Sequence, residues 1–275
     1  MCLLTADGQV IAHTEASRVH TSPRWSPDSS RLLFVDSSGE MMGLYLMDAD
    51  GRYLKRLTRR FRRCEAPSWS PDGSQILFHA LCGSSVEVCL VRADGTGERA
   101  LTHTRGSDHQ PAWSPDGTRI AFVSARAGRP WLHEMRADGS RPRRLQRKAA
   151  GAWWPSWSPD GRQIAFLGGA CHELSVWLIR TDGTAERRLA TGAVTPMPAG
   201  PPLWLADGRR LLFVGRRPGD DHAALYVLDT DSGAYRILVR GVNLDAMPSL
   251  LPAPRVTTAR STSASRSPAT ARSRR

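Results

Sequence analysis

Short apolar runs separated by tight polar turns recur along this chain, and the run after each turn is apolar on both faces. Residues 119–123 are typical, because Ile, Ala, Phe and Val are consecutive there, which suits a strand buried between two layers. A polar loop, an apolar run at 131–135, an Asp138-Gly139 turn and a short run at 143–145 follow. Since no segment of sufficient length has a helical period, the pattern predicts short antiparallel strands and an all-β chain.

The same unit is copied at a fixed spacing. Trp-Ser-Pro-Asp begins at Trp25, Trp69, Trp113 and Trp157, each 44 residues after the last, and a weaker Trp-Leu-Ala-Asp-Gly begins at Trp204, 47 residues further on. Ser, Pro, Asp and Gly in this order favour a type I turn. Four-stranded units repeated every ~40–45 residues are typical of the blades of a β-propeller. A solenoid of parallel strands is the alternative, but the tight turns indicate antiparallel neighbours.

The ends of the repeat region predict a sixth, incomplete blade in addition to the five full repeats. Thr5 to Gly8 match Asp48 to Gly51, so the residues on either side of this first turn are expected to be a third and a fourth strand. Residues 245–251 resemble the start of another first strand, with Leu250 where Trp is expected. We therefore expect residues 1–14 and 245–251 to share a blade that lacks its second strand.

A propeller domain is thus expected at residues 1–251, followed by a segment of another kind. Residues 252–275 contain only Pro, Ala, Arg, Val, Thr and Ser, a composition that supports no core, so we expect disorder there. This tail is either a natural basic extension or the result of a fragment end or a change of reading frame. Sequencing the locus would distinguish them.

The formal net charge is +12, and nearly all of the 38 basic residues are arginines. Two clusters are prominent: Lys55, Arg56, Arg59, Arg60, Arg62 and Arg63, and Arg141, Arg143, Arg144, Arg147 and Lys148. Both are expected on outermost strands and inter-blade loops, where charge blocks unwanted edge pairing. A nucleic-acid interface is the alternative, but we favour solvated outer strands and do not expect nucleic acid as a partner.

The cysteines and the chain start add little. Cys2, Cys64, Cys82, Cys89 and Cys171 have neither metal-type spacing nor a relation to the repeat, so no disulfide framework or metal site is predicted. The first residues lack a signal-peptide pattern, and no apolar run reaches membrane-spanning length. No cofactor motif occurs, and no cofactor is expected.

Candidate catalytic groups have simpler structural explanations. The repeated aspartates are predicted to cap their own turns, and the repeated tryptophans to pack between blades: Asp28, Asp72, Asp116, Asp160 and Asp207, with Trp25, Trp69, Trp113, Trp157 and Trp204. Asp108 and His109 have the arrangement of a base and its orienting partner. Because no Gly-x-Ser-x-Gly, His-Glu-x-x-His or phosphate-binding loop accompanies them, we favour a loop histidine and expect no enzyme.

Recognition is better sought where the copies differ, just before each first strand. Variable residues on a rigid scaffold are common binding positions. The predicted partner-binding residues are His20, Glu65, Asp108, His109, Trp153 and Trp154. The adjacent Trp153 and Trp154 are extra to the repeat and serve either as an aromatic anchor for a partner or in packing between blades.

The pattern Pro-x-Trp-Ser-Pro-Asp-Gly, Ile-Ala-Phe, Asp-Ala-Asp-Gly and Arg-Leu-Thr resembles the WD-repeat-like propeller repeat of the TolB family, over roughly residues 1–250. The resemblance implies six blades, a non-catalytic scaffold for protein–protein interaction, a periplasmic location and a cell-envelope partner such as a peptidoglycan-associated lipoprotein. We expect a monomer.

Similar repeats also form the gating propellers of prolyl-oligopeptidase-like serine peptidases. The alternative function is therefore such a propeller, with its hydrolase domain outside this chain. A Gly-x-Ser-x-Gly segment further along the reading frame would favour it.

Overall fold

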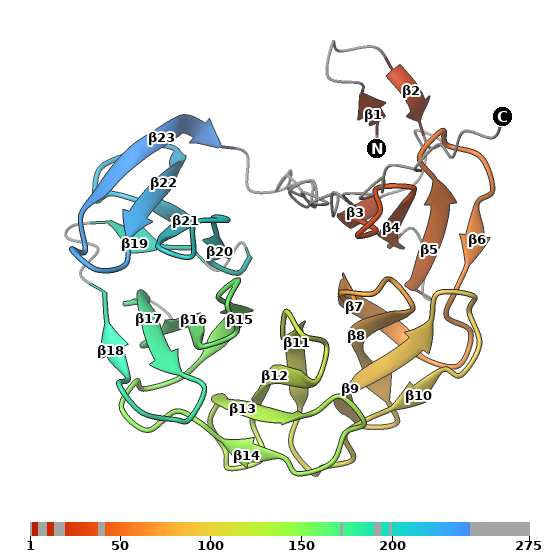
Figure 1. Ribbon diagram of the computed structural model, residues 1–275, viewed down its shortest axis with the longest axis horizontal. Coiled ribbons are helices and arrows are strands. Elements are labelled where there is room, and N and C mark those ends of the chain that lie inside the picture. The colour runs from red at the N-terminus through yellow and green to blue at the C-terminus, as the bar shows by residue number, and fades with distance from the viewer. Residues whose placement is uncertain are drawn as a thin grey trace, which may run out of the picture.

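A computed structural model describes residues 2–4, 10–13, 20–37, 42–170, 173–189, 194–197 and 200–242. All regular elements in these ranges are strands. These ranges contain no helix long and apolar enough to span a membrane. Figure 1 shows five antiparallel sheets arranged around a common centre, with these strands on the inner side: β3 (His20–Trp25), β7 (Arg62–Trp69), β11 (Asp108–Trp113), β15 (Trp153–Trp157) and β20 (Leu203–Trp204). The predicted all-β propeller with five full repeats is confirmed.

Each blade is a meander whose strands follow chain order from the centre to the rim. Blade 1 consists of β3 (His20–Trp25), β4 (Arg31–Asp36), β5 (Gly43–Asp48) and β6 (Lys55–Arg56). Blade 2 consists of β7 (Arg62–Trp69), β8 (Gln75–Cys82), β9 (Ser85–Arg92) and β10 (Arg99–Ala100). Blade 3 consists of β11 (Asp108–Trp113), β12 (Arg119–Ser124), β13 (Trp131–Arg136) and β14 (Arg143–Arg144).

Blades 4 and 5 continue the series. Blade 4 consists of β15 (Trp153–Trp157), β16 (Gln163–Gly168), β17 (Ser175–Arg180) and β18 (Arg187–Arg188). Blade 5 consists of β19 (Thr195–Pro196), β20 (Leu203–Trp204), β21 (Arg210–Arg216), β22 (Ala223–Asp229) and β23 (Tyr235–Val242). Because β19 and β20 both pair with β21, the longer spacing before Trp204 is absorbed by a divided first strand.

A separate hairpin precedes the five blades. β1 (Cys2–Leu4) pairs antiparallel with β2 (Val10–His13), at the positions where the third and fourth strands of a sixth blade were expected. The predicted contribution of residues 245–251 to this blade, and the tail at 252–275, lie outside the described residues.

The repeated aspartates cap their own turns, as predicted. In the third copy, Asp116 Oδ1 accepts hydrogen bonds from Ser114 Oγ at 2.6 Å and from the Thr118 backbone N–H at 3.0 Å. The same bond from the backbone two residues on recurs at Asp28, Asp72, Asp160 and Asp207. These bonds favour the charged carboxylate and lower its pKa, to about 2 for Asp28. The carboxylates are therefore committed to the turns.

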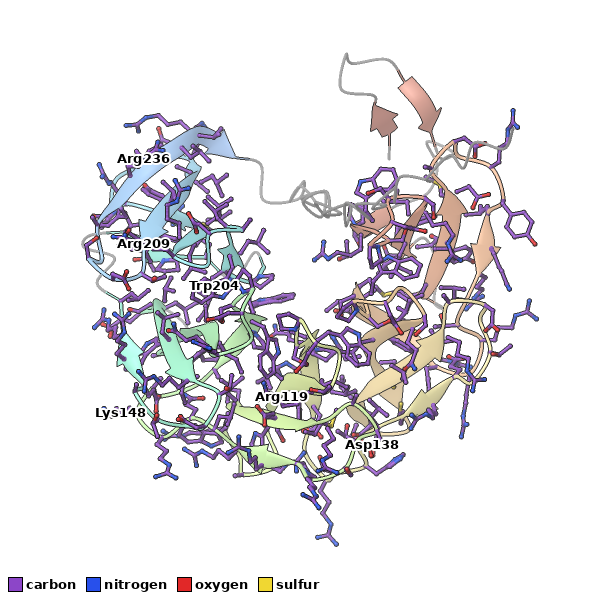
Figure 2. All side chains as sticks on the ribbon, viewed as in Figure 1. Arg119, Asp138, Lys148, Trp204, Arg209 and Arg236 are labelled. Carbon is purple, nitrogen blue, oxygen red and sulfur yellow. The ribbon has the colours of Figure 1, made fainter. Side chains whose placement is uncertain are left out.

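The repeated tryptophans tie each blade to the one before it. Trp69 Nε1 donates to the Arg24 carbonyl, Trp157 Nε1 to the Ala112 carbonyl and Trp204 Nε1 to the Ser156 carbonyl, each at 3.1 Å. Figure 2 shows Trp204 on the inner side of its blade. Trp113 differs, because its Nε1 is buried without a hydrogen-bond partner in the described structure. The predicted packing role is thus confirmed, and the seam between blades 2 and 3 lacks the indole hydrogen bond in the described structure.

Two glutamates secure the loops between blades. Glu186 accepts hydrogen bonds from three consecutive backbone N–H groups, those of Arg147, Lys148 and Ala149, at 2.7, 2.8 and 2.9 Å. Glu98 lies two repeats earlier, 88 residues before Glu186, and accepts the same three bonds from the loop at 59–61. Because these loops carry the basic clusters, part of the arginine-rich sequence lies where carboxylates organise the backbone.

The basic residues of the rim also join neighbouring blades. Arg143 donates to the Thr181 carbonyl and Arg187 to the Thr230 carbonyl, both at 2.7 Å and both across a seam. Lys55 donates to the Asp94 carbonyl in the same way. The predicted position on outer strands and inter-blade loops is confirmed for most of these residues, and Figure 2 shows Lys148 and Arg236 at the rim. Arg62 and Arg63 are the exceptions, because they begin β7, the first strand of blade 2.

We expect Trp157→Phe to lower the free energy of unfolding by about 1–2 kcal/mol more than Trp113→Phe. Both changes keep most of the buried ring area, but only the first removes a hydrogen bond and the stacking of Arg119, whose guanidinium lies 4.7 Å from the Trp157 ring centre. Urea denaturation followed by far-UV circular dichroism measures the difference. Equal losses would show that the indole hydrogen bond does not contribute.

We expect Glu186→Ala to cost about 2–4 kcal/mol, because three backbone N–H groups lose a charged acceptor that is almost fully buried. The matched variant Glu98→Ala should cost less, since water reaches the loop that Glu98 caps. The same denaturation experiment compares the two. A larger loss for Glu98→Ala would contradict this assignment.

Candidate functional site

A bulge in the first strand of each of the first four blades shapes the centre of the ring. The bulged residues Ser22, Ala66, Gln110 and Trp154 are 44 residues apart and have φ of 53°, 48°, 52° and 54°. This left-handed conformation is uncommon for residues other than glycine and costs on the order of 1–3 kcal/mol. A proline follows each of them, so the bulge has the same place in every copy. The bulged residue itself differs from copy to copy.

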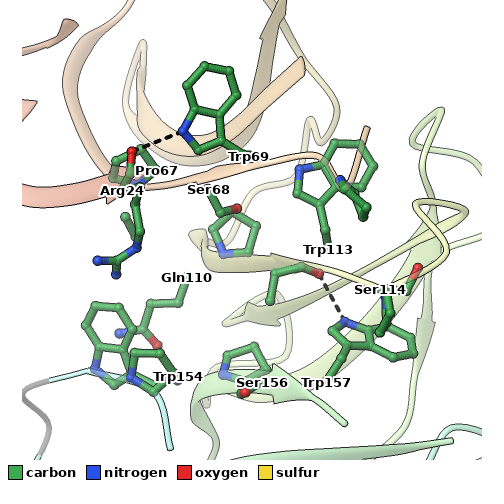
Figure 3. A pocket seen from close by; sticks show the side chains of 17 residues that line it. Arg24, Pro67, Ser68, Trp69, Gln110, Trp113, Ser114, Trp154, Ser156 and Trp157 are labelled. Atoms are coloured by element: carbon green, nitrogen blue, oxygen red, sulfur yellow. Dashed lines mark hydrogen bonds between the residues drawn. The ribbon is translucent and has the colours of Figure 1, made fainter. Parts of the chain in front are cut away.

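The bulged residues of blades 2, 3 and 4 border a cavity of about 310 Å³ that residues from all five blades line. We call it the channel site. Figure 3 shows its wall, which consists of tryptophan rings, prolines and a few polar side chains: Arg24, Ala66, Ser68, Trp69, Gln110, Trp113, Ser114, Trp154, Ser156 and Trp157, with Pro67, Pro71, Pro111, Ala112, Pro115, Pro155 and Pro201. Flat apolar faces with few polar groups are typical of binding sites.

A chain of polar contacts beside the channel site joins blade 2 to blade 4. Gln110 Oε1 accepts a hydrogen bond from the Trp154 backbone N–H at 2.8 Å, and the backbone N–H of Gln110 donates to His79 Nδ1 at 3.4 Å. His79 Nε2 lies 3.7 Å from Glu65 Oε2. The interaction with His79 lowers the pKa of Glu65, which is half exposed. Glu65 therefore offers a negative charge next to Ala66 of the channel site.

The predicted residues Asp108 and His109 have different environments. Asp108 is fully buried, and its Oδ2 accepts hydrogen bonds from Arg126 at 3.0 Å and from Thr104 Oγ1 at 3.2 Å. His109 is partly buried, with its ring 6.2 Å from that of His79. Burial, reinforced by the charge of His79, lowers the pKa of His109 to about 4. Asp108 thus anchors the start of β11, and the His109 ring lies beside His79, one residue before Gln110 of the channel site.

The predicted aromatic pair is divided between two uses. Trp154 lines the channel site, whereas Trp153 lies over Gly151 and pairs with Leu167. Both rings are partly buried and pack against the apolar core that blade 4 shares with blade 5. His20 begins β3 opposite Asp36, and its side chain lies outside the described residues.

The sequence prediction missed two residues of the wall. Gln110 and Arg24 both line the cavity, and Arg24 is the charged residue among its lining side chains. The signal was present, since Arg24 is the variable residue of Pro-x-Trp, at the position that Ser68, Ala112 and Ser156 occupy in the next copies. Burial lowers the pKa of Arg24 from its ordinary value.

The described part of the chain holds neither a metal-ligand cluster nor a thiol with a lowered pKa. It contains no group of three His, Cys, Asp or Glu residues placed to hold a metal ion. Cys64, Cys82 and Cys89 are free thiols packed in or against the core that blade 2 shares with blade 1, and burial raises the pKa of Cys64 to about 12. Thiols held in the protonated form are poor nucleophiles.

Four-stranded antiparallel blades around a central cavity define a β-propeller. The family model of the TolB beta propeller domain matches residues 61–202, which is more than half of the chain. The chain therefore belongs to the TolB β-propeller family. A comparison with curated protein sequences gives no significant match.

Solved structures agree on the fold. The putative TolB from Agrobacterium tumefaciens superposes with a TM-score of 0.70 at 23% identity, covering 85% of both chains. TolB from Acinetobacter baumannii gives 0.69 at 20% identity over 86% of this chain and 58% of that chain. A puromycin-hydrolyzing peptidase from Mycobacterium tuberculosis gives 0.65 at 17% identity over 84% of this chain and 39% of the peptidase. At these identities the similarity establishes the shared fold.

We expect the stability of the protein to fall as the pH decreases from about 6.5 to about 4, and His109→Gln to remove about 1–2 kcal/mol of that decrease. The pKa of His109 is lowered in the folded state to about 4, so within this window the unfolded chain binds the proton more readily. Urea denaturation at pH 7 and pH 4.5 measures the effect. His222→Gln, at an exposed position in blade 5, is the control, and an equal effect of both variants would contradict the assignment.

Proposed function

We propose that this chain is a non-catalytic scaffold for protein–protein interaction, and that the channel site binds a segment of the partner. The observation that carries the proposal is the composition of this cavity. Tryptophan and proline faces from several blades surround a small number of hydrogen-bonding groups. Rigid aromatic surfaces of this kind contribute much of the free energy at protein interfaces. Glu65, His109 and Trp153 each precede a lining residue in the sequence, and we propose that they extend the contact surface.

Family membership supports the choice of partner. We propose a cell-envelope partner, such as a peptidoglycan-associated lipoprotein, a periplasmic location and a monomeric scaffold. Cell fractionation tests the location, and light scattering after size-exclusion chromatography tests the monomer. These properties are independent of the channel site, so a different location would leave the binding proposal to be judged by its own experiment.

We expect a photo-crosslinking residue in place of Ala66, in the channel site, to capture the partner in cells, whereas the same residue in place of Tyr53 does not. Tyr53 is 77% exposed on the outer hairpin of blade 1 and provides a matched surface position. Mass spectrometry identifies the captured protein, which is then purified. Isothermal titration calorimetry should show binding weakened at least about tenfold by Gln110→Ala and by Trp154→Ala.

Tyr53→Ala is the binding control, and circular dichroism verifies that each variant is folded. Binding that is unchanged by both channel variants would contradict the proposed site. Replacing Trp153 and Trp154 together tests the aromatic pair in the same assay. Turnover of peptide or oligosaccharide substrates by the purified chain, lost in the channel variants, would contradict the non-catalytic role.

A second function is favoured by one structural comparison. The chain matches 39% of the puromycin-hydrolyzing peptidase, which is compatible with a propeller that controls access to a hydrolase domain. In that case the crosslinking experiment should capture a serine hydrolase domain instead of an envelope protein. The same channel residues would then face the substrate.

A further inference from the structure

The channel wall carries one feature that packing does not explain, the guanidinium of Arg24. Three later copies of the repeat place Ser68, Ala112 and Ser156 at this position, all small and uncharged. Arg24 is therefore a local departure from the repeat at a position that faces the cavity. A long charged side chain there needs a physical reason, because removing a charge from water is costly unless a partner compensates.

Arg24 lacks the carboxylate partner that comparable arginines have. Its described hydrogen bond is donated by Nη1 to the carbonyl of the adjacent Pro23, at 2.9 Å, and no acidic side chain pairs with it within the described ranges. By contrast, Arg119 lies 3.3 Å from Glu134 and Arg126 lies 3.0 Å from Asp108. Among the described residues, no negative charge compensates that of Arg24 in its partly buried position.

A second hydrogen-bond donor faces the same space. Because Gln110 Oε1 accepts from the Trp154 backbone N–H, the amide oxygen is fixed on that side and Nε2 is left as a donor. No described group accepts a hydrogen bond from Nε2. Figure 3 shows the Arg24 guanidinium, the Gln110 amide and the Trp154 ring directed toward one part of the cavity. The site therefore presents donors and one positive charge beside an aromatic face.

We propose that the channel site recognises an extended segment of the partner protein through a single carboxylate, which pairs with Arg24 and accepts a hydrogen bond from Gln110. This inference rests on the proposed function. A guanidinium binds a carboxylate through two parallel hydrogen bonds, and one negative charge matches the single positive charge of the wall. The tryptophan and proline faces pack against the apolar residues on either side of the acid. The carboxylate belongs to a Glu or Asp side chain or to a chain terminus.

A defined peptide tests this inference. Heptapeptides displayed on phage are selected on the immobilised wild-type chain, and the consensus is synthesised in acidic form and with its Glu or Asp changed to Gln or Asn, each with a free or an amidated C-terminus. Isothermal titration calorimetry then compares the wild type, Arg24→Gln and Arg24→Lys. We expect the wild type to bind the acidic peptide at least about tenfold more tightly than its amide analogue.

The variants locate the source of this preference. Arg24→Gln should bind both peptides equally, and Arg24→Lys should retain part of the preference because the charge remains without the paired hydrogen bonds. Loss of affinity on amidation of the C-terminus, rather than of the side chain, would identify the terminal carboxylate as the ligand. Arg24→Gln should stay folded, since Trp69 bonds to the backbone of this residue and not to its side chain.

Two other outcomes separate the inference from the function on which it rests. Peptides that bind in the channel, as shown by weaker binding to Gln110→Ala, but without preference for an acid would overturn the inference and leave the scaffold function intact. If no selected peptide is weakened by Gln110→Ala or Trp154→Ala, both the inference and the proposed function are wrong.

Discussion

The propeller depends on the contact of one indole ring with the blade before it. Trp69 and Trp157 are almost completely buried at their seams. Each donates to a backbone carbonyl of the preceding blade, that of the residue just before the repeated tryptophan of that blade. Donor and acceptor belong to the same short motif, Pro-x-Trp, so one copy can both give and receive the bond, as in blade 4, where Trp157 donates and the Ser156 carbonyl accepts. The angle between blades is therefore encoded within each repeat, and the central cavity follows from it.

This economy leaves some positions free to vary. Asp116 and its counterparts are committed to turns, and the repeated tryptophans are held at the seams, where Trp69, Trp113 and Trp157 also form part of the cavity wall. The variable residue of Pro-x-Trp and the bulged residue before the proline face the cavity and are not required for the repeat. Arg24 and Gln110 occupy these positions, which is how a regular scaffold acquires a site of particular chemistry.

The sequence was sufficient for the regular part of the structure, because the period of 44 residues and the Ser-Pro-Asp-Gly turns determine strand order and turn geometry. It was less informative about the site. The left-handed conformation of Gln110 has no residue-type signature, and Arg24 was indistinguishable from ordinary variation in a basic chain. Asp108 was expected to face a partner, but an ion pair with Arg126, 18 residues away, holds it in the interior. Such a pairing depends on strand register and on side-chain direction, which local patterns do not specify.

The unpartnered indole of Trp113 distinguishes one seam between blades from the others. The seam between blades 2 and 3 lacks the tie that Trp69, Trp157 and Trp204 supply elsewhere in the described structure. It also lacks a loop clamp, because Pro142 stands where Glu98 and Glu186 stand in blades 2 and 4. The indole hydrogen bonds thus link blade 2 to blade 1 and join blades 3, 4 and 5, whereas the hydrogen bond from the Gln110 backbone N–H to His79 crosses from blade 3 to blade 2. A ligand that engages Gln110 would therefore bind at the seam between blades 2 and 3, which the indole hydrogen bonds leave unlinked.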